Sequence, residues 1–188
     1  PMIAHVLERT AAVRGLDEVI LATSVSDRDD GLASTAVALG FMVFRGDEHD
    51  VLGRFAVAAI AREATVVVRI TGDCPLLAPE VCERVLTRLQ QGGCAYAWND
   101  TRCSGYPDGT DCEAFTLAAL LAADGRAYLR VDREHVTPWI RAHRPTAIVG
   151  CPDDWRHLKL SVDRESDYAR VTAIYGRLAP GDFSLDAT

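Results

Sequence analysis

Helical and strand-forming patterns alternate along most of this 188-residue chain, and that alternation constrains the fold more than any other feature. Strand-like apolar runs occupy residues 18–25, 41–44 and 65–70, and segments with helical spacing of apolar residues separate them. A repeated strand–helix–strand order predicts parallel strands joined by crossover helices that cover both faces of the sheet. The sequence therefore predicts an α/β fold with a mostly parallel sheet flanked by helices.

After residue 93 the regular alternation of strands and helices ends, and we expect shorter elements. We expect strands at 94–98, 112–115, 146–150 and 158–162, a polar loop at 99–111, and helices at 117–123, 134–142 and 166–178. This pattern predicts a mixed antiparallel extension that carries specificity loops. Because no repeat or low-complexity linker interrupts the chain, we expect residues 1–188 to form a single domain.

Composition excludes several kinds of partner. The chain has 20 basic and 27 acidic residues and a formal charge of −7, without a basic cluster, which argues against a nucleic-acid partner. No apolar run approaches the roughly 20 residues that a membrane span requires, so we expect no membrane partner either. The six cysteines are widely spaced and contain no C-x-x-C pair, a pattern typical of reduced thiols in a cytoplasmic protein.

Motifs that are missing narrow the enzyme classes. The chain contains neither a P-loop G-x-x-x-x-G-K-[ST] nor a dinucleotide-binding G-x-G-x-x-G sequence. It also lacks the G-x-S-x-G sequence of many hydrolases. Dehydrogenase and hydrolase functions therefore lose their usual support.

Two aspartates directly follow strand-like runs. Asp73 comes after VVVRITG and before Cys74-Pro75, and Asp163 comes after HLKLSV. In open α/β sheets, ligands bind beyond the carboxyl ends of the strands, where these side chains would converge. Two carboxylates suit a magnesium ion that carries nucleotide phosphates, because Mg²⁺ uses few protein ligands. Alternatively, each aspartate caps the helix that follows it.

Arginines and acidic residues occupy comparable positions. Arg45 follows the run at 41–44, and Arg69 lies inside the run at 65–70, where a buried guanidinium requires a carboxylate or a ligand phosphate as its partner. Of these two partners, the structural carboxylate is favoured. Asp108, Asp111 and Glu113 lie in a turn-rich loop, which is either a solvated hairpin or a lid whose carboxylates bind hydroxyl groups. Glu134 and His135 lie at the start of a predicted helix, where a histidine is more often a structural partner than a catalyst.

Five segments together resemble a known family. These are FRGDEHDVLGRF (44–55), VVVRITGDCPLLAPEV (66–81), YPDGTDCEAF (106–115), REHVTPWI (133–140) and LKLSVDRESDYARV (158–171). In order and spacing they resemble the cytidylyltransferases of spore-coat polysaccharide biosynthesis, which are related to the synthetases of CMP-activated sugar acids. The resemblance extends from residue 1 to about residue 178.

The resemblance implies a fold, a reaction and a site. The fold is the Rossmann-like nucleotide-diphospho-sugar transferase fold, and the reaction transfers CMP from CTP to a sugar, sugar acid or phosphonate, releasing pyrophosphate with Mg²⁺ as cofactor. It further implies a homodimer that pairs through the segment at 94–145. We expect catalytic roles for Asp73, Arg69 and Asp163, metal binding by Asp73 and Asp163, and substrate binding by Arg45, Asp108, Asp111, Glu113, Glu134 and His135.

One departure from the family pattern accompanies this resemblance. The family's opening strand and its arginine-rich, glycine-containing loop ending in L-P-G-K, which holds the base and the triphosphate, have no counterpart in residues 1–188. We therefore expect a single domain without that strand and loop, either because a segment precedes this sequence or because the segment has been lost. The alternative functions are a glycosyltransferase that consumes a nucleotide sugar and a catalytically silent binding domain of the same fold.

Overall fold

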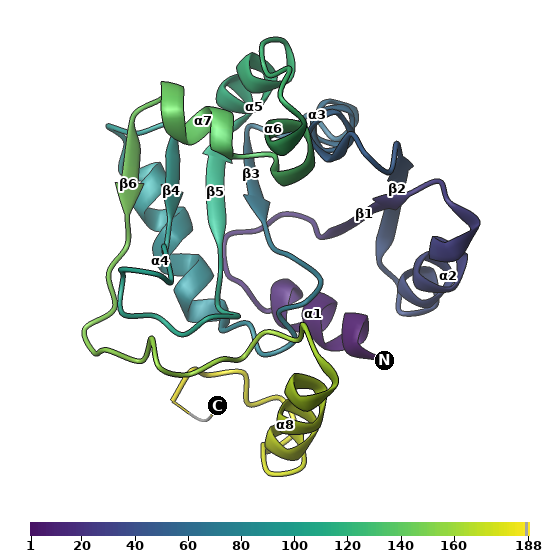
Figure 1. Cartoon of the computed structure of the whole chain (residues 1–188), viewed down its shortest axis with the longest axis vertical. Helices are drawn as coiled ribbons and strands as arrows, with labels where there is room; N and C mark the ends of the chain where they lie inside the picture. Colours follow the sequence, from purple (N-terminus) through teal and green to yellow (C-terminus); the bar gives the residue numbers. More distant parts are fainter. Residues whose placement is uncertain (187) are drawn as a thin grey trace.

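The structure is a computed structural model that describes residues 1–186 and 188. Helices and strands alternate through the first half of the chain, as the sequence predicts (Figure 1). The elements in chain order are α1 (Met2–Ala11), β1 (Ile20–Ser24), η1 (Asp27–Asp29), α2 (Asp30–Ala38), β2 (Met42–Gly46), α3 (Val51–Ala61), β3 (Val66–Arg69), α4 (Pro79–Gln90), β4 (Tyr96–Trp98), β5 (Glu113–Thr116), α5 (Leu117–Asp124), α6 (Arg130–His135), α7 (Pro138–His143), β6 (Thr146–Ile148) and α8 (Glu165–Tyr175).

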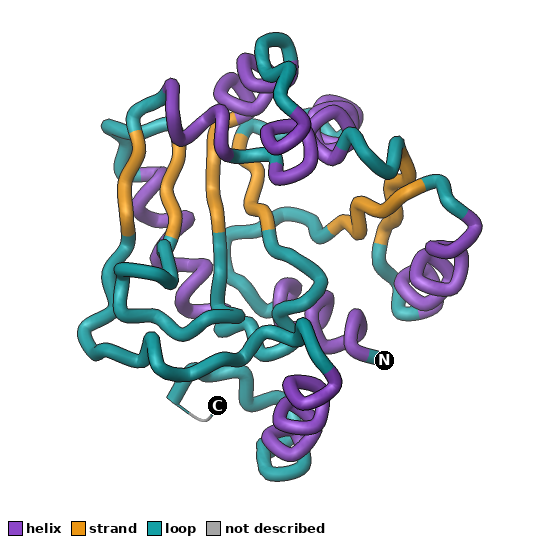
Figure 2. The backbone as a smooth tube through the Cα atoms, in the orientation of Figure 1, coloured by secondary structure: helices purple, strands orange, loops and turns teal. Residues whose placement is uncertain are grey.

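The strands form two sheets, which Figure 2 shows as two separate orange groups. One is a parallel pair, β1 and β2, whose register aligns Ile20 with Met42. The other has the order β3-β5-β4-β6, in which β5 runs antiparallel to both of its neighbours and β4 runs parallel to β6. The α/β class and the mixed extension are confirmed, but β3 pairs with β5 and not with β1.

The four-stranded sheet is packed between helices on both faces. Tyr96 and Phe115 point to the face that α3, α5 and α7 cover, whereas their neighbours Ala97 and Ala114 point to the face that α4 covers. All four side chains are fully buried, in the two-residue alternation that a pleated strand imposes. Burial of each large side chain stabilises the fold by about 1.5–3 kcal/mol. The helices packed on the two faces therefore hold the four-stranded sheet, and with it the site, in place.

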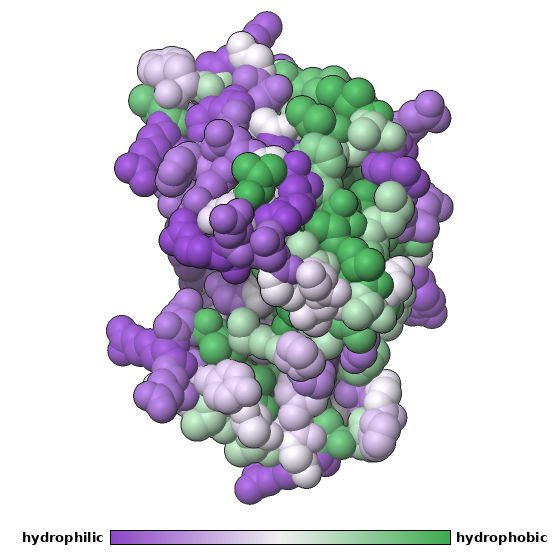
Figure 3. All heavy atoms as spheres, turned by 90° about the vertical axis from the view of Figure 1, so that its right-hand side faces the viewer, coloured by the Kyte–Doolittle hydropathy of each residue, from purple (hydrophilic) through white to green (hydrophobic). Residues whose placement is uncertain are grey.

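A groove of about 830 Å³ lies between the two sheets. Apolar side chains of α1, β1, α3 and β3 line it, among them Leu7, Ile20, Phe55 and Val67. Within the described residues, β1 pairs only with β2 and β3 only with β5, so each strand leaves one edge without a partner. On the side of the molecule where β1, β2 and α3 lie, apolar atoms gather in a broad green band (Figure 3). The expectation that β3 is covered on both faces is confirmed, because Val67 packs against the cluster of α3 and α5, and Val66 and Val68 pack against the cluster of α4. Its parallel pairing is wrong, since β3 runs antiparallel to β5, and its residues are only partly buried.

The expected strand at 158–162 is also wrong. This segment forms a single isolated bridge, between Lys159 and Asp108. The Leu160 amide donates to the Asp108 carbonyl at 2.6 Å, and the Val162 amide donates to the Asp73 carbonyl at 2.9 Å. The backbone of this segment therefore bonds to two different loops, the one that contains Asp108 and the one that contains Asp73. It does not pair with a single strand, which explains why only an isolated bridge forms.

The expected helix at 134–142 is split into α6 and α7. Pro138 has no amide hydrogen to continue α6, and its ring would collide with the carbonyl four residues earlier. Between the helices Val136 adopts φ 69° and ψ −52°, and the Thr137 amide donates to the His135 carbonyl at 2.7 Å, which closes a γ-turn. A β-branched residue with positive φ is strained, so packing around the buried Val136 must hold this turn.

None of the helices in the described part of the chain has both the length and the apolar character needed to cross a membrane.

Candidate active site

A cleft of about 290 Å³ opens at one edge of the four-stranded sheet. β3 and β4 end there with Arg69 and Trp98, and the antiparallel β5 begins there with Glu113. The loops that leave or enter these strands complete the walls. The lining residues are Arg69, Thr71, Asp73, Cys74, Trp98, Asn99, Asp100, Thr101, Arg102, Asp108, Asp111, Cys112, Glu113, Arg141 and Ser161.

Most of the predicted site residues meet at this cleft. Arg69, Asp73, Asp108, Asp111 and Glu113 all line it. Asp163 is not among the described residues that line the cleft, but the side chain of Lys159 links it to Asp108. Residues far apart in the sequence are therefore brought to one place, as expected for strand-terminal side chains.

Three predicted substrate-binding residues lie elsewhere. Arg45 donates to the carbonyls of Ser24 and Ser26 at 2.8 and 2.9 Å and pairs with a nearby aspartate, which ties the end of β1 to β2. Glu134 lies 3.7 Å from Arg130 and lines the groove between the sheets. His135 ends α6 and is absent from the cleft lining among the described residues. Their predicted role in substrate binding remains a prediction.

The carboxylate of Glu113 lies in the cleft and accepts three hydrogen bonds from its neighbours. One carboxylate oxygen accepts a hydrogen bond from Arg69 at 2.6 Å, and the other accepts from the hydroxyl groups of Tyr96 and Thr137, each at 2.6 Å. Burial, with the adjacent carboxylate as a second cause, raises the pKa of Tyr96 and keeps its phenol protonated. The guanidinium of Arg69 therefore has the structural carboxylate partner that the sequence favoured.

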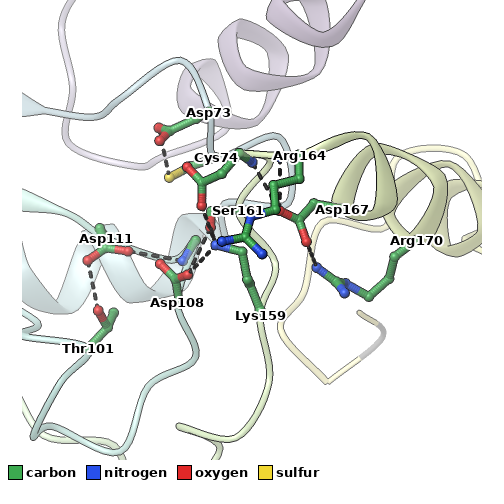
Figure 4. Close-up of polar contacts among 12 residues, drawn as sticks. Asp73, Cys74, Thr101, Asp108, Asp111, Lys159, Ser161, Arg164, Asp167 and Arg170 are labelled. Carbon is green, nitrogen blue, oxygen red and sulfur yellow. Dashed lines mark hydrogen bonds and ion pairs between the residues drawn. The ribbon is translucent and has the colours of Figure 1, made fainter.

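A second network joins the loop at 105–111 to the segment at 158–163 (Figure 4). Lys159 donates to Asp108 at 3.1 Å, to Ser161 at 2.9 Å and to Asp163. The carboxylate of Asp163, followed by that of Asp108, raises the pKa of Lys159. Sequence reasoning missed Lys159, although it is the only lysine in the chain and lies four residues before Asp163.

The two candidate metal ligands come from adjacent segments, because the Val162 amide donates to the Asp73 carbonyl at 2.9 Å. The Asp73 carboxylate accepts only a long contact of 3.6 Å from the Cys74 thiol within the described residues. Helix capping is not the role of either aspartate, since Ala78 precedes α4 and Arg164 precedes α8 as the capping residue. Both carboxylates are therefore available to a ligand, Asp163 once Lys159 moves.

The donor chemistry of these two aspartates suits a magnesium ion that also binds phosphate oxygens. Among the described residues there is no group of three or more His, Cys, Asp or Glu side chains that could hold a metal ion. Mg²⁺ commonly binds through one or two carboxylates, with waters and phosphate oxygens as its remaining ligands. The pair of Asp73 and Asp163 is of that kind, because two carboxylates leave positions for a triphosphate.

The PDGTD turn is fixed by close packing. The Asp111 carboxylate accepts from the Thr101 hydroxyl at 2.9 Å and from the Gly109 amide at 3.0 Å, and burial raises its pKa. Gly109 has φ 98°, and a Cβ atom there would lie 2.2 Å from the backbone nitrogen of Ser161. Only glycine meets both conditions, so this residue locks the turn onto the segment that carries Lys159 and Asp163.

An aromatic and two arginines form the remaining wall, which sequence reasoning also missed. The guanidinium of Arg141 lies 4.5 Å from the centroid of the Trp98 ring, and that of Arg102 lies 5.8 Å from it. Arg102 is also paired with Asp100 through bonds of 2.8 and 2.9 Å. No local pattern marks these residues, because α7 approaches β4 only in the folded chain.

Comparison with known proteins decides the family. A protein-family model described as cytidylyltransferase matches residues 1–177. The chain belongs to the cytidylyltransferase family. Its similarity to SpsF of Bacillus subtilis, a spore coat polysaccharide biosynthesis protein, is 32% identity over 166 residues, which cover 85% of this chain and 67% of SpsF. The family expected from the five motifs is confirmed.

Other relatives of this cytidylyltransferase are longer than the chain. An uncharacterized protein of Methanocaldococcus jannaschii is 37% identical over 134 residues, covering 71% of this chain and 54% of that protein. A 3-deoxy-manno-octulosonate cytidylyltransferase of Anaeromyxobacter dehalogenans is 38% identical over 95 residues, covering 49% of this chain and 38% of the enzyme. The chain thus spans about half the length of the first of these relatives and less of the second.

Solved structures confirm the fold. A cytidylyltransferase from Leptospira borgpetersenii superposes with a TM-score of 0.90 at 26% identity, covering 99% of this chain and 80% of that one. CMP:2-keto-3-deoxy-manno-octonic acid synthetase, solved with CTP, gives a TM-score of 0.66 at 15% identity and covers 94% of this chain and 88% of that one, a likeness of fold alone. The Rossmann-like nucleotidyltransferase fold is therefore established for this family member.

Proposed function

We propose that this chain transfers CMP from CTP to a sugar, sugar acid or phosphonate acceptor. The acceptor oxygen attacks the α-phosphorus, the bond from that phosphorus to the oxygen bridging to the β-phosphate breaks, and pyrophosphate leaves. The proton of the attacking oxygen passes to a cleft carboxylate or to solvent. The observation that carries this proposal is the convergence of the Asp73 and Asp163 segments beside a cleft rich in hydrogen-bonding groups.

Each part of the site has a role in this proposal. Asp73 and Asp163 would hold Mg²⁺, which supplies positive charge against the charge that develops on the phosphates. Asp108 and Asp111 would accept hydrogen bonds from acceptor hydroxyls, as they already do from Ser161 and Thr101. Glu113 and Arg69 keep the floor rigid, so that the acceptor oxygen is presented in one orientation.

Pyrophosphate release tests the proposal. The protein would be incubated with Mg²⁺ and each of the four nucleoside triphosphates, against a panel of sugars, sugar acids and phosphonates. We expect release that requires CTP and an acceptor. Turnover of a nucleotide sugar without pyrophosphate would indicate a glycosyltransferase, and the absence of both activities and of CTP binding would indicate a silent binding domain.

We also propose that an extended strand fills the groove between β1 and β3. The facing edges of these strands are unpaired within the described residues, and a β-strand inserted between them would join the two sheets. Hydrogen-exchange measurements on protein from the native host test it, since fast amide exchange at both strand edges would contradict it.

Assembly and compartment complete the proposal. We infer a homodimer that pairs through residues 94–145, where Tyr128, Leu129 and Val131 are exposed, Tyr128 by 87%. Light scattering on the wild type and on Leu129→Glu tests this, and a monomeric wild type would overturn it. All six cysteines are free thiols, which supports a cytoplasmic protein.

A further inference from the structure

Arg141 has hydrogen-bond donors that the folded chain does not use. Its guanidinium lines the cleft and is packed against Trp98, with 32% of its side chain exposed. It forms a long ion pair with Glu113, whose nearest carboxylate oxygen lies at 4.0 Å, beyond hydrogen-bond distance. Within residues 1–186 and 188, no hydrogen bond is formed by this guanidinium.

Glu113 does not need Arg141. Its carboxylate already accepts three short hydrogen bonds, and one of them comes from the cationic Arg69. Charge and hydrogen-bonding capacity at Glu113 are therefore satisfied without a second guanidinium. The positive charge of Arg141 is left facing the cleft.

The other cations of this site are engaged. Arg69 and Arg102 pair with Glu113 and Asp100 at 2.6 and 2.8 Å. Lys159 pairs with Asp108 and Asp163. Arg141 differs from them, because its ion pair with Glu113 is long, at 4.0 Å, and contains no hydrogen bond. Among the described cations around the cleft, a ligand could therefore reach the Arg141 donors without first breaking a hydrogen bond.

The guanidinium of Arg141 is also held in position before any ligand arrives. The Trp98 ring supports one face of it, and cation–π packing of this kind restricts the side chain. The helix that carries it begins beside Thr137, whose hydroxyl is bonded to the buried Glu113. A rigid planar guanidinium with free parallel N–H groups matches the two oxygens of a carboxylate or the oxygens of a phosphonate.

We propose that Arg141 is the group that binds an anionic substituent, a carboxylate or a phosphonate, on the acceptor. This inference rests on the proposed function and narrows its substrate class: neutral sugars are excluded as the preferred acceptors. Asp108 and Asp111 remain to bind hydroxyl groups of the same molecule, so the acceptor carries hydroxyls together with one anionic group.

Direct binding tests the inference without turnover. Calorimetric titration would use three probes: 3-deoxy-manno-octulosonate for the carboxylate, 2-hydroxyethylphosphonate for the phosphonate, and glucose as the neutral sugar. The variants are Arg141→Gln, Arg141→Lys and the control Arg144→Gln. Arg144 lies at the end of the same helix, packs on Trp139 instead of Trp98, and does not line the cleft.

We expect at least one anionic probe to bind the wild type more tightly than glucose. Arg141→Gln should weaken that probe by about tenfold or more, because a charge-assisted hydrogen bond is lost. Arg141→Lys should recover part of the affinity, and Arg144→Gln should match the wild type. Thermal melting of each variant checks that the fold is retained.

Three results would overturn the inference: anionic probes that bind no better than glucose, unchanged binding by Arg141→Gln, or an equal loss of CTP affinity in that variant. The last would assign Arg141 to the triphosphate. Titration of the wild type with CTP and Mg²⁺ tests the proposed function separately. A protein that binds the anionic probe through Arg141 but not CTP would contradict only the proposed function.

Discussion

The ammonium group of Lys159 donates a hydrogen bond to the carboxylate of Asp163, one of the two aspartates that we propose as metal ligands. The same ammonium also reaches Asp108, so it is a cation held between two acidic side chains. A divalent ion that binds Asp163 must displace this internal cation. If the two aspartates bind a metal as proposed, its affinity would depend on competition with Lys159 as well as on the two carboxylates.

Lys159→Met is expected to tighten binding of Mn²⁺, used as a paramagnetic substitute for Mg²⁺. The pair is partly exposed, so we expect a gain of about two- to fivefold, in line with the free energy of a surface ion pair. Electron paramagnetic resonance titration of free Mn²⁺ measures it. Arg170→Met is the control, because Arg170 pairs with Asp167 and not with Asp163. Weaker binding by Lys159→Met would show that the lysine supports the metal site.

Asp73→Asn and Asp163→Asn are each expected to abolish most pyrophosphate release. Asparagine keeps the shape of the side chain but removes the charge that Mg²⁺ requires. The melting temperature should change little, because neither side chain caps a helix and Asp163 is more than half exposed. Near wild-type turnover in both variants would refute the metal assignment.

Gly109→Ala is expected to destabilise the protein more than Gly92→Ala does. Both glycines have positive φ, 98° and 81°, but a Cβ at Gly92 meets no atom within 4 Å, whereas one at Gly109 meets the backbone of Ser161 at 2.2 Å. Gly92→Ala therefore reports backbone strain alone, about 1 kcal/mol or somewhat more in free energy of unfolding. Chemical denaturation measures both. Equal losses would show that the 105–111 loop does not need its close approach to residues 160–161.

Acid should remove a stabilising contribution of Asp29. Hydrogen bonds from Ser24 and then Thr23 lower the pKa of Asp29 from 3.8 to about 2. Because the folded state has the lower pKa, the contribution is fully present above pH 3.8 and is lost as the pH falls toward 2. Asp29→Asn should therefore show a smaller fall in melting temperature between these pH values than the wild type does. Parallel melting curves for the two proteins would contradict this.

The sequence by itself determined the elements and the ends of strands at which chemistry could occur. Helical spacing, strand-like runs and turn residues such as Pro79 are local signals, because side-chain periodicity and backbone preference act within a few residues. They predicted the α/β class and the approach of Asp73 to Asp163, whereas the place of Asp108 and Asp111 in the site came only from the family resemblance. The five motifs indicated the cytidylyltransferase family.

Tertiary structure alone decided which strands are neighbours and which charges meet. The β3 sequence is compatible with either sheet pairing, and its place beside β5 depends on the strand order of the whole sheet. The contacts of Glu113 with Arg69, and of Trp98 with Arg141, join segments whose separation exceeds the range of any local pattern. Their geometry is fixed only when the helices and strands pack, so no inspection of periodicity could have revealed that Arg141 is left with donors for a ligand.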